Sequence, residues 1–516
     1  MACWESGQLT ARVELTEKCR GTMKGKILGI FTVLVVLCTC LAFATSDPWW
    51  NLSSSKFLQP GNIQNLLNRL SLFGVLGIGV AFVIITSGID LSIGSTVCLC
   101  GVLLSILLKV DYQPADQISV IKVVAAEKLI VVDDAATDFR PGTTFRYTGG
   151  VGSGLVLTID SATVVNETTE IRVKESLSRN EADGKIVLMT PVIRFGDVET
   201  TTVEISTDQH IEVGDQLQLV KADGAVTTQK ITRAEAYGAW SLTLAKDPGA
   251  KYRSDSFAIV LLRHQRTSIP VAILLVLLVG TGLGLVHGLL VTKVKLQPFV
   301  VTLCALLIYR GISRWLTSDN PAGFGELQEV LGPMASGRIG LVFRGQEMVF
   351  GIPIPFFLLT AIGVVASVFL GRTIWGRYLL ALGRNEEAAR FSGINTGRVT
   401  LMAYVICTVL AALGGMLFAL DSTSVTPSSF GNSYELYAIA AAVLGGCSLR
   451  GGEGSILGVV IGTAVMQVLN NLITLLKIPQ SLEYTIIGAV ILIGVLGDEF
   501  VRRAAARRRL KQSVNS

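Results

Sequence analysis

The sequence predicts an all-α polytopic membrane protein of about ten transmembrane helices, into which one all-β domain is inserted. The prediction rests on two observations. Half of the 516 residues are hydrophobic and the mean hydropathy is +0.56, too apolar for a soluble globular protein of this size. Apolar runs that can cross the ~30 Å hydrocarbon layer as helices recur along the chain. They are interrupted at residues 111–265, where Val, Ile, Thr and Asp dominate.

The expected membrane spans are runs without any charged residue. Seven are long: 27–45, 71–89, 91–108, 267–291, 349–371, 400–420 and 454–476. Three shorter runs complete the ten, as tilted, broken or protein-buried helices: 296–309, 436–449 and 484–497. The first run, preceded by Lys24 and Lys26, exceeds the ~7–15 apolar residues of a secretory signal. We therefore expect it to be retained as a helix rather than cleaved.

The charge pattern predicts the orientation of the spans. Cytoplasmic loops of membrane proteins carry an excess of Lys and Arg. The first 26 residues contain five basic residues, and the tail 499–516 contains six. Both ends are therefore expected in the cytoplasm, together with the arginine-rich loop 372–399. The inserted segment has 16 basic and 22 acidic residues, a net charge of −6, and is expected on the opposite side. A positive-inside anchor explains the basic tail, so no nucleic-acid partner is expected.

The chain is accordingly divided into four parts: 1–110 with the tail and the first three spans, the β-rich insert 111–265, spans four to ten in 266–498, and the basic tail 499–516. Alternating apolar and polar residues separated by turn pairs such as Asp223-Gly224 indicate strands in the insert. The insert also contains similar segments about 72 residues apart: 139–145 and 211–217, 159–162 and 231–234, 171–173 and 242–244. Two small, similar β-barrels or sandwiches are expected.

The segment 86–95, Thr-Ser-Gly-Ile-Asp-Leu-Ser-Ile-Gly-Ser, predicts a broken helix. A helix enters, breaks at Gly88, presents Asp90 and restarts at Leu91. An acid at membrane depth is costly unless it is paired or hydrated, which makes Asp90 a candidate functional residue. The simpler interpretation is that its carboxylate caps the following helix. The two roles are compatible.

The loop 372–399 contains a second motif. Residues 386–391 are amphipathic and helix-prone, and Gly393 is a natural C-terminal stop. A short exposed helix between two spans suits a peripheral motor protein. An ordinary interfacial helix with arginines near the lipid headgroups explains the pattern equally well.

Glycine spacing marks two further regions. The pattern GxxxGxxxG, which allows helices to pack closely, occurs in the fourth and ninth spans, at Gly280, Gly284 and Gly288 and at Gly454, Gly458 and Gly462. These spans run in opposite directions, which is typical of an inverted repeat, here of spans two to five and seven to ten. A second broken helix is expected at Gly445 and Gly446, before the Arg450/Glu453 pair. Arg310 can snorkel from its span, and His287 is better explained by a helix–helix hydrogen bond than by a ligand.

The sequence lacks the motifs that several kinds of chemistry require. None of the nine cysteines lies in the insert and there is no CxxC pair, so no disulfide and no metal site are expected. The phosphate-binding pattern GxxxxGK[ST] does not occur, so the chain is not an ATPase by that mechanism. No catalytic triad or paired-carboxylate arrangement is apparent. We expect neither enzymatic activity nor a cofactor.

Four segments in order, 86–95, 293–303, 383–395 and 437–454, resemble the ribose/xylose/arabinose/galactoside permeases of ATP-binding cassette (ABC) importers. That family is related to the branched-chain amino acid permeases. The resemblance covers nearly all of the chain outside 111–265. It implies a type II-like importer fold and the role of permease subunit, which forms the path for a monosaccharide and couples to separate ATPase subunits.

The resemblance also implies partners and site residues. The partners are an ABC ATPase, an extracytoplasmic sugar-binding protein, a second permease copy, either identical or different, and membrane lipid. The ATPase would dock on Gly383, Arg384, Asn385, Glu386, Glu387, Ala388, Ala389, Gly393 and Ile394. The translocation region would include Asn65, Asp90, Ser92, Gly445 and Gly446.

Typical family members have a short loop where this chain has its insert. The insert either contacts the binding protein or another envelope component, or is a solvated decoration. The sequence leaves two other functions open. One is an ion-coupled secondary transporter of a small polar solute, for which Asp90 alone is thin support. The other is an envelope sensor or structural protein working through the insert, for which ten spans exceed what an anchor needs.

Overall fold

A computed structural model describes residues 27–47, 51–134, 139–148, 154–177, 184–196, 201–236, 239–340 and 351–489, together with residues 492 and 496. The chain divides into two compact units. One is helical and is made of residues 1–109 and 267–516, and the other is the insert, residues 110–266. The basic ends of the chain and part of the last expected span lie outside the described residues.

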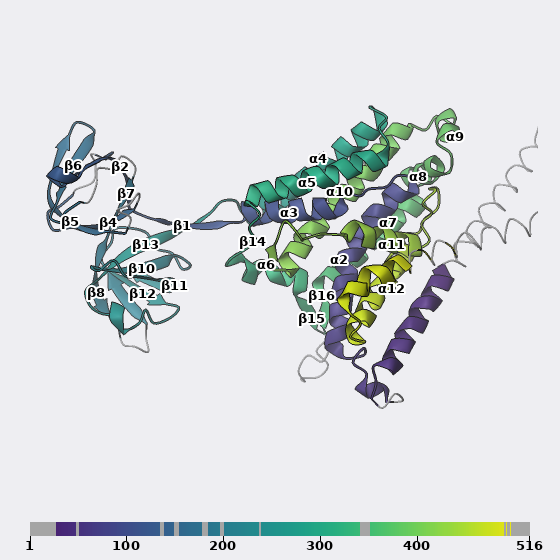
Figure 1. The fold of residues 1–516 in the computed structure, drawn as a ribbon, viewed down its shortest axis with the longest axis horizontal. Coiled ribbons are helices and arrows are strands. Elements are labelled where there is room, and N and C mark those ends of the chain that lie inside the picture. The colour runs from purple at the N-terminus through teal and green to yellow at the C-terminus, as the bar shows by residue number, and fades with distance from the viewer. Residues whose placement is uncertain are drawn as a thin grey trace, which may run out of the picture. The chain divides into compact units, whose positions relative to one another are not determined.

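The helical unit is built around long apolar helices (Figure 1). Its helices are Ile27–Ala44, α2 (Pro60–Ile85), α3 (Ile93–Leu107), α4 (Ile269–Thr292), α5 (Pro298–Thr317), α6 (Leu327–Ser336), α7 (Ile354–Arg372), α8 (Ile374–Arg384), α9 (Glu386–Phe391), α10 (Thr396–Asp421), α11 (Tyr434–Leu444) and α12 (Ile456–Leu475). Two short antiparallel pairs join them: β14 (Ala322–Gly323) with β17 (Ser424–Val425), and β15 (Arg338–Gly340) with β16 (Gly351–Pro353).

The expected class, an all-α membrane protein of about ten spans with a separate all-β insert, is wrong. Of the described residues, 53% are in helices and 22% in strands, and short strand pairs also lie within the helical unit, so this part of the chain is a mixed α and β protein. Within the described residues, seven helices are long and apolar enough to cross a membrane. The apolar helices α3 and α11 are shorter, with 15 and 11 residues. The three other expected spans are shorter than this, as α3 and α11, or lie only partly within the described residues, as 484–497.

Close helix packing in this unit depends on glycine. The helix α10 packs against α4, α2 and α3. At Gly284 of α4, an added Cβ would lie 2.2 Å from Thr408 Oγ1 and 2.6 Å from Val405 Cα. At Gly462 of α12, it would lie 2.2 Å from the carbonyl oxygen of Ala441 in α11. Both glycine rows therefore lie at helix contacts, where any larger side chain would force the backbones apart.

The insert consists of thirteen described strands. They are β1 (Val110–Pro114), β2 (Gln117–Val124), β3 (Leu129–Val132), β4 (Thr144–Thr148), β5 (Val156–Val165), β6 (Thr168–Val173), β7 (Gly184–Leu188), β8 (Thr190–Phe195), β9 (Thr202–Ile205), β10 (Gln216–Lys221), β11 (Val226–Ala236), β12 (Trp240–Leu244) and β13 (Ser256–Gln265). The strands β2–β7 form a closed barrel in the order β2-β3-β6-β5-β4-β7. The order β8-β9-β12-β11-β10-β13 closes in the same way through the β13–β8 pairing.

The two barrels share their pairing order and their local details. The N–H of Gly142 donates to the carbonyl of Ile159 at 2.8 Å, and the N–H of Gly214 donates to that of Ile231 at 3.0 Å. Both glycines have positive φ, +91° and +107°, which favours glycine at these two turns. Each barrel has its own apolar core, with Ile159 and Ile231 fully buried at equivalent positions.

Equivalent surfaces of the two barrels face each other. Val187 and Ile259, at equivalent positions of β7 and β13, lie in one buried apolar cluster with Met189 and Val220. Arg146 Nη1 donates to Gln218 Oε1 at 3.0 Å, and these two residues are also equivalent. Contact between equivalent surfaces is the arrangement of a two-fold interface. The strand β1 pairs with β13, so the two ends of the insert lie side by side.

Candidate translocation and coupling site

The chain breaks its helical path between α2 and α3. Thr86 ends α2, and Ser87 takes a left-handed conformation with φ +65°. Gly88 lies so close to its neighbours that an added Cβ would be 2.9 Å from the Tyr404 hydroxyl and 2.9 Å from Val83 Cγ1. Residues 88–92 have no regular secondary structure, and α3 starts at Ile93. Irregular backbone at membrane depth is tolerated where it is buried in protein or lines a cavity.

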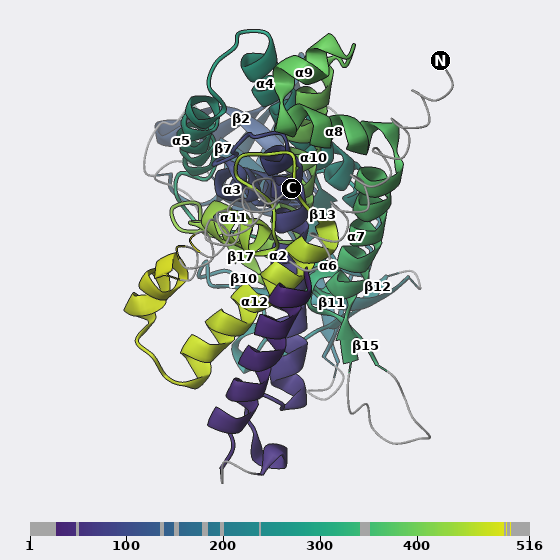
Figure 2. The same ribbon diagram turned by 90° about the vertical axis from the view of Figure 1, so that its right-hand side faces the viewer.

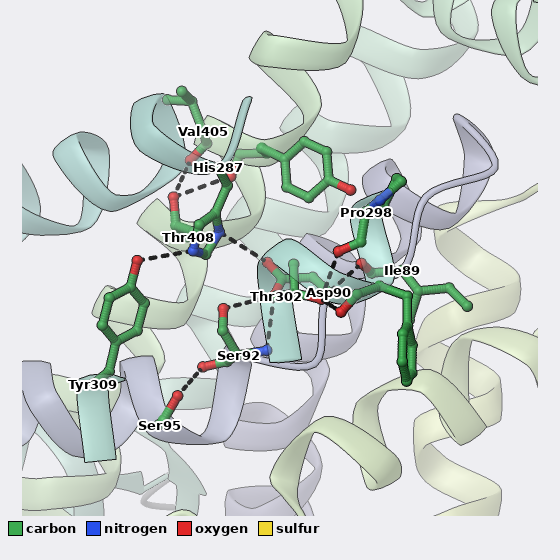
Figure 3. A network of polar contacts seen from close by, with 12 residues as sticks. Ile89, Asp90, Ser92, Ser95, His287, Pro298, Thr302, Tyr309, Val405 and Thr408 are labelled. Carbon is green, nitrogen blue, oxygen red and sulfur yellow. Dashed lines mark hydrogen bonds and ion pairs between the residues drawn. The ribbon is translucent and has the colours of Figure 1, made fainter. Parts of the chain in front are cut away.

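Asp90 lies in this break and is fully buried. Its Oδ1 accepts hydrogen bonds from the Ser92 backbone N–H at 2.9 Å and from Ser92 Oγ at 2.7 Å (Figure 3). Ser92 is the N-cap residue of α3, so Asp90 fixes the turn from which α3 starts. The carboxylate therefore has a structural role at the helix start.

The second carboxylate oxygen of Asp90 faces a histidine. Asp90 Oδ2 lies 3.9 Å from Nδ1 of His287, which is 1% exposed. Neither atom has a hydrogen-bond partner within the described part of the chain. A shift of about 1 Å would bring them to hydrogen-bonding distance. The other ring nitrogen, Nε2, is 2.8 Å from the Tyr309 hydroxyl, and the two rings stack with centroids 5.7 Å apart.

Side chains satisfy the backbone carbonyls freed by the breaks. Thr302 Oγ1 on α5 lies 3.3 Å from the carbonyl oxygen of Ile89. Arg310 Nη1 donates to the carbonyl of Pro427 at 2.9 Å and also to that of Phe430, both in the loop between β17 and α11. Arg310 is thus held by backbone oxygens inside the protein, whereas the sequence suggested that it snorkels towards water.

The segment expected to meet an ATPase forms two short helices, α8 and α9, at one end of the helical unit (Figure 2). Asn385 Oδ1 caps α9 by accepting from the Ala388 N–H at 3.0 Å. At the other end, the N–H groups of Gly393 and Ile394 donate to the carbonyls of Arg390 and Ala389, the hydrogen bonds of a Schellman motif. Phe391 is 86% exposed, the largest exposed fraction among the large hydrophobic side chains of the described residues.

This segment contacts the break before Asp90. At Gly383, the end of α8 approaches α2 so closely that an added Cβ would lie 1.8 Å from the Ile85 carbonyl oxygen. Ser87 Oγ lies 3.2 Å from the carbonyl oxygen of Gly383 and 2.9 Å from that of Arg450. The Gly452 N–H donates to the Ile85 carbonyl at 2.9 Å. The end of α8, the loop after α11 and the α2–α3 break therefore meet at one place, which we call the Ser87 junction.

The structure brings some of the expected site residues together and separates others. Asp90 and Ser92 are bonded to each other, and Gly383 lies at the Ser87 junction. Gly445 ends α11 against the backbone of Gly458, and Gly446 follows with φ +87°. Asn65 lies near the other end of α2, about 30 Å from Ile85 at 1.5 Å per residue, where its Oδ1 accepts from Arg338 at 3.3 Å.

The remaining expected residues lie on the surface of α8 and α9. Arg384, Asn385, Glu386, Glu387, Ala388 and Gly393 are exposed, Ile394 is half-buried, and Ala389 is buried under α9. Sequence reasoning missed Ser87, Thr302, Tyr309 and Tyr404. Their contacts join segments distant in the sequence, and only the unusual density of Thr, Ser and Gly around residue 88 could have indicated them.

The chain is similar in sequence to known membrane permeases. A family model for the permease component of branched-chain amino acid transport systems matches residues 248–495. The ribose import permease protein of Escherichia coli K12 is 36% identical over 230 residues, which cover 44% of this chain and 68% of that protein. The chain belongs to this permease family. The resemblance drawn from the sequence motifs is therefore confirmed.

Two further relatives are also permease proteins of sugar transport. The xylose transport system permease protein of E. coli K12 is 31% identical over 284 residues, covering 46% of the chain and 72% of that protein. The ribose import permease protein of Bacillus subtilis 168 is 39% identical over 213 residues, covering 41% and 62%. No solved structure matches the chain. The protein is thus a multi-pass membrane permease of an ABC importer.

The two roles of Asp90 are separable by substitution. In Asp90→Asn, the amide oxygen still accepts both Ser92 hydrogen bonds, so we expect near-normal amounts of folded permease and most of the solute uptake. In Asp90→Leu, the Ser92 groups lose their acceptor at a cost of about 1–3 kcal/mol, and the folded amount should fall. Size-exclusion profiles in detergent and uptake by cells measure both. Ser95→Ala, which removes only a bond to the Ser92 carbonyl, is the control. Loss of uptake in a fully folded Asp90→Asn would instead assign the charge to transport.

Proposed function

We propose that this permease imports a monosaccharide such as ribose, xylose, arabinose or galactose, and that separate ATPase subunits supply the energy. The proposal is supported by relatives whose names specify ribose, L-arabinose and xylose transport. The observation that carries the mechanism is the Ser87 junction, where the exposed α8–α9 segment contacts the break that holds Asp90. The chain itself performs no chemistry in this proposal.

The coupling then follows from the contacts. An ATPase bound to α8 and α9 would displace Gly383, which is packed against the end of α2. Ser87 contacts both Gly383 and Arg450. A displacement of α8 would therefore move the α2–α3 break and the loop after α11 together. These loops precede α3 and follow α11, so ATP-driven closure would move both short apolar helices. Asp90, Ser92, Gly445 and Gly446 belong to the proposed translocation region.

The proposed assembly has further members. Two permeases, identical or different, form the membrane path, and an extracytoplasmic binding protein delivers the sugar. The chain lies in the cell membrane with both ends in the cytoplasm, as the positive-inside pattern indicates. In this orientation α8 and α9 face the ATPase and the insert faces the binding protein.

Phe391 tests the docking of the ATPase. Its exposed side chain at the end of α9 is suited to anchor a partner, since buried aromatic anchors dominate many interfaces. We expect Phe391→Ala to weaken ATPase retention by about 2 kcal/mol or more, roughly 30-fold, with unchanged folding. The measurement is affinity purification of the tagged permease in mild detergent from its native host, with quantitative mass spectrometry.

The control for this experiment is Trp315→Ala, which removes a side chain that is 78% exposed on α5. It should leave ATPase retention unchanged. If the wild-type chain purifies without an ATPase where a known importer retains its own, an ion-coupled transporter becomes the better proposal. If Phe391→Ala retains the ATPase fully, the partner grips another surface.

We also propose that the insert contacts the binding protein, on the grounds of its net charge of −6 and its expected side of the membrane. Deletion of 113–263 tests this. The deletion removes both barrels and joins Tyr112 to His264, which lie close together because Tyr112 pairs with Arg263 in the β1–β13 ladder. We expect the shortened permease to keep its ATPase and to lose at least tenfold in binding-protein affinity, measured by surface plasmon resonance. Unchanged affinity would overturn this proposal and leave another envelope component or a solvated decoration as the explanation of the insert.

A further inference from the structure

A polar cavity of about 610 Å³ lies among α2, α11, α12 and the segment after α12. Such a volume is within the ~300–1,000 Å³ typical of small-molecule sites. The cavity is at the end of α2 opposite to the α2–α3 break, so it is separate from the Ser87 junction. We propose that it binds one neutral monosaccharide within the permease itself. This inference rests on the proposed function and names a substrate site for it.

Amide side chains give the cavity its character. It is lined by six of them: Asn62, Asn65, Asn432, Gln467, Asn470 and Asn471. Each amide carries both a hydrogen-bond donor and an acceptor, as does each hydroxyl of a sugar. A lining of this kind suits a ligand that presents many hydroxyl groups in different directions.

Two of these amides lack partners. Gln467 is 2% exposed, and its Nε2 has no hydrogen-bond partner among the described residues. The buried Oδ1 of Asn470 also has none in that part of the chain. Buried polar atoms are nearly always hydrogen-bonded, so an unpaired donor and an unpaired acceptor lining one cavity indicate a polar ligand or water. The donor and the acceptor are one helical turn apart on α12.

Two other amides of the cavity lining do have hydrogen-bond partners. Asn62 and Asn471 bond each other reciprocally across α2 and α12, at 2.7 and 3.2 Å. Asn62 also donates to the Phe57 carbonyl at 2.8 Å. These two side chains therefore hold the helices together, whereas Gln467 and Asn470 are available to a ligand.

Aromatic side chains form a second wall. Phe73, Tyr434 and Tyr437 line the cavity and pack together, with the Phe73 ring centroid 5.0 Å from that of Tyr434 and 5.5 Å from that of Tyr437. The Tyr437 hydroxyl donates to Glu483, which fixes its position. A ring face beside hydrogen-bonding groups suits a sugar, which has an apolar C–H face and a polar rim.

Charge favours a neutral ligand. Arg69 and Glu483 are the charged residues that line the cavity, and their formal charges cancel. A site for a phosphate or carboxylate ligand would carry excess positive charge. No metal-binding group of His, Cys, Asp and Glu occurs among the described residues.

The test is direct binding to the full-length wild-type permease in lipid nanodiscs, by saturation-transfer difference NMR with D-ribose, D-xylose, L-arabinose and D-galactose separately. We expect at least one sugar to bind. Gln467→Leu and Asn470→Leu should each weaken that binding roughly tenfold, the loss expected when a hydrogen-bonding group is removed. Thr463→Val is the matched control, since Thr463 is buried on the same helix and its hydroxyl donates to the carbonyl of Val459.

The outcomes separate this inference from the proposed function. Binding that survives in Thr463→Val and falls in both leucine variants supports the cavity. Absence of binding for all four sugars, or equal binding in the wild type and both leucine variants, overturns it. An equal loss in Thr463→Val also overturns it, because the effect would not be specific to the cavity. If the wild type retains its ATPase and none of the sugars binds, only the cavity assignment fails. If a sugar binds at the cavity and no ATPase is retained, only the ABC coupling fails.

Discussion

The helical unit depends on one constraint: backbone polar groups at membrane depth must find their hydrogen-bond partners inside the protein. At the helix breaks described above, a group from a distant segment of the chain supplies the hydrogen-bond partner. The Gly452 N–H bonds the Ile85 carbonyl, Thr302 lies by that of Ile89, and Arg310 bonds two carbonyls before α11. The same requirement that stabilises each break ties it to another helix. The breaks are consequently the points at which segments far apart in the sequence are mechanically connected.

This connection explains why small residues gather at the same points. Gly383 and Gly452 allow the backbones of α8, α2 and the loop after α11 to approach within hydrogen-bonding distance of one another. A side chain at either position would separate the groups that satisfy the break. Asp90 adds a buried acid whose Oδ1 holds the start of α3 and whose Oδ2 faces His287. The Ser87 junction, Asp90 and the start of α3 thus follow one another directly along the chain.

The local features of the fold were accessible from the sequence. The break at Gly88, the turn at Gly393 and the strand alternation of the insert depend on neighbouring residues, and each is present in the structure. The lengths of the helices were less accessible, since α3 and α11 have only 15 and 11 residues although they lie in apolar runs. The Asp90–His287 pair joins residues almost 200 positions apart, and the amide-lined cavity draws on three helices. Helical periodicity shows which side chains share a face, but it carries no information on which faces meet.

The central claim is that ATP hydrolysis moves the translocation path through the Ser87 junction, and the Ser87→Ala permease tests it most directly. This variant keeps the backbone but removes the hydroxyl that contacts the Gly383 and Arg450 carbonyls. The measurement is the number of sugar molecules taken up per ATP hydrolysed, by the importer purified with its ATPase and binding protein and reconstituted in liposomes. The account predicts continued ATP hydrolysis with a several-fold lower uptake per ATP. An unchanged ratio in the variant would contradict it, because energy would then reach the path without the junction.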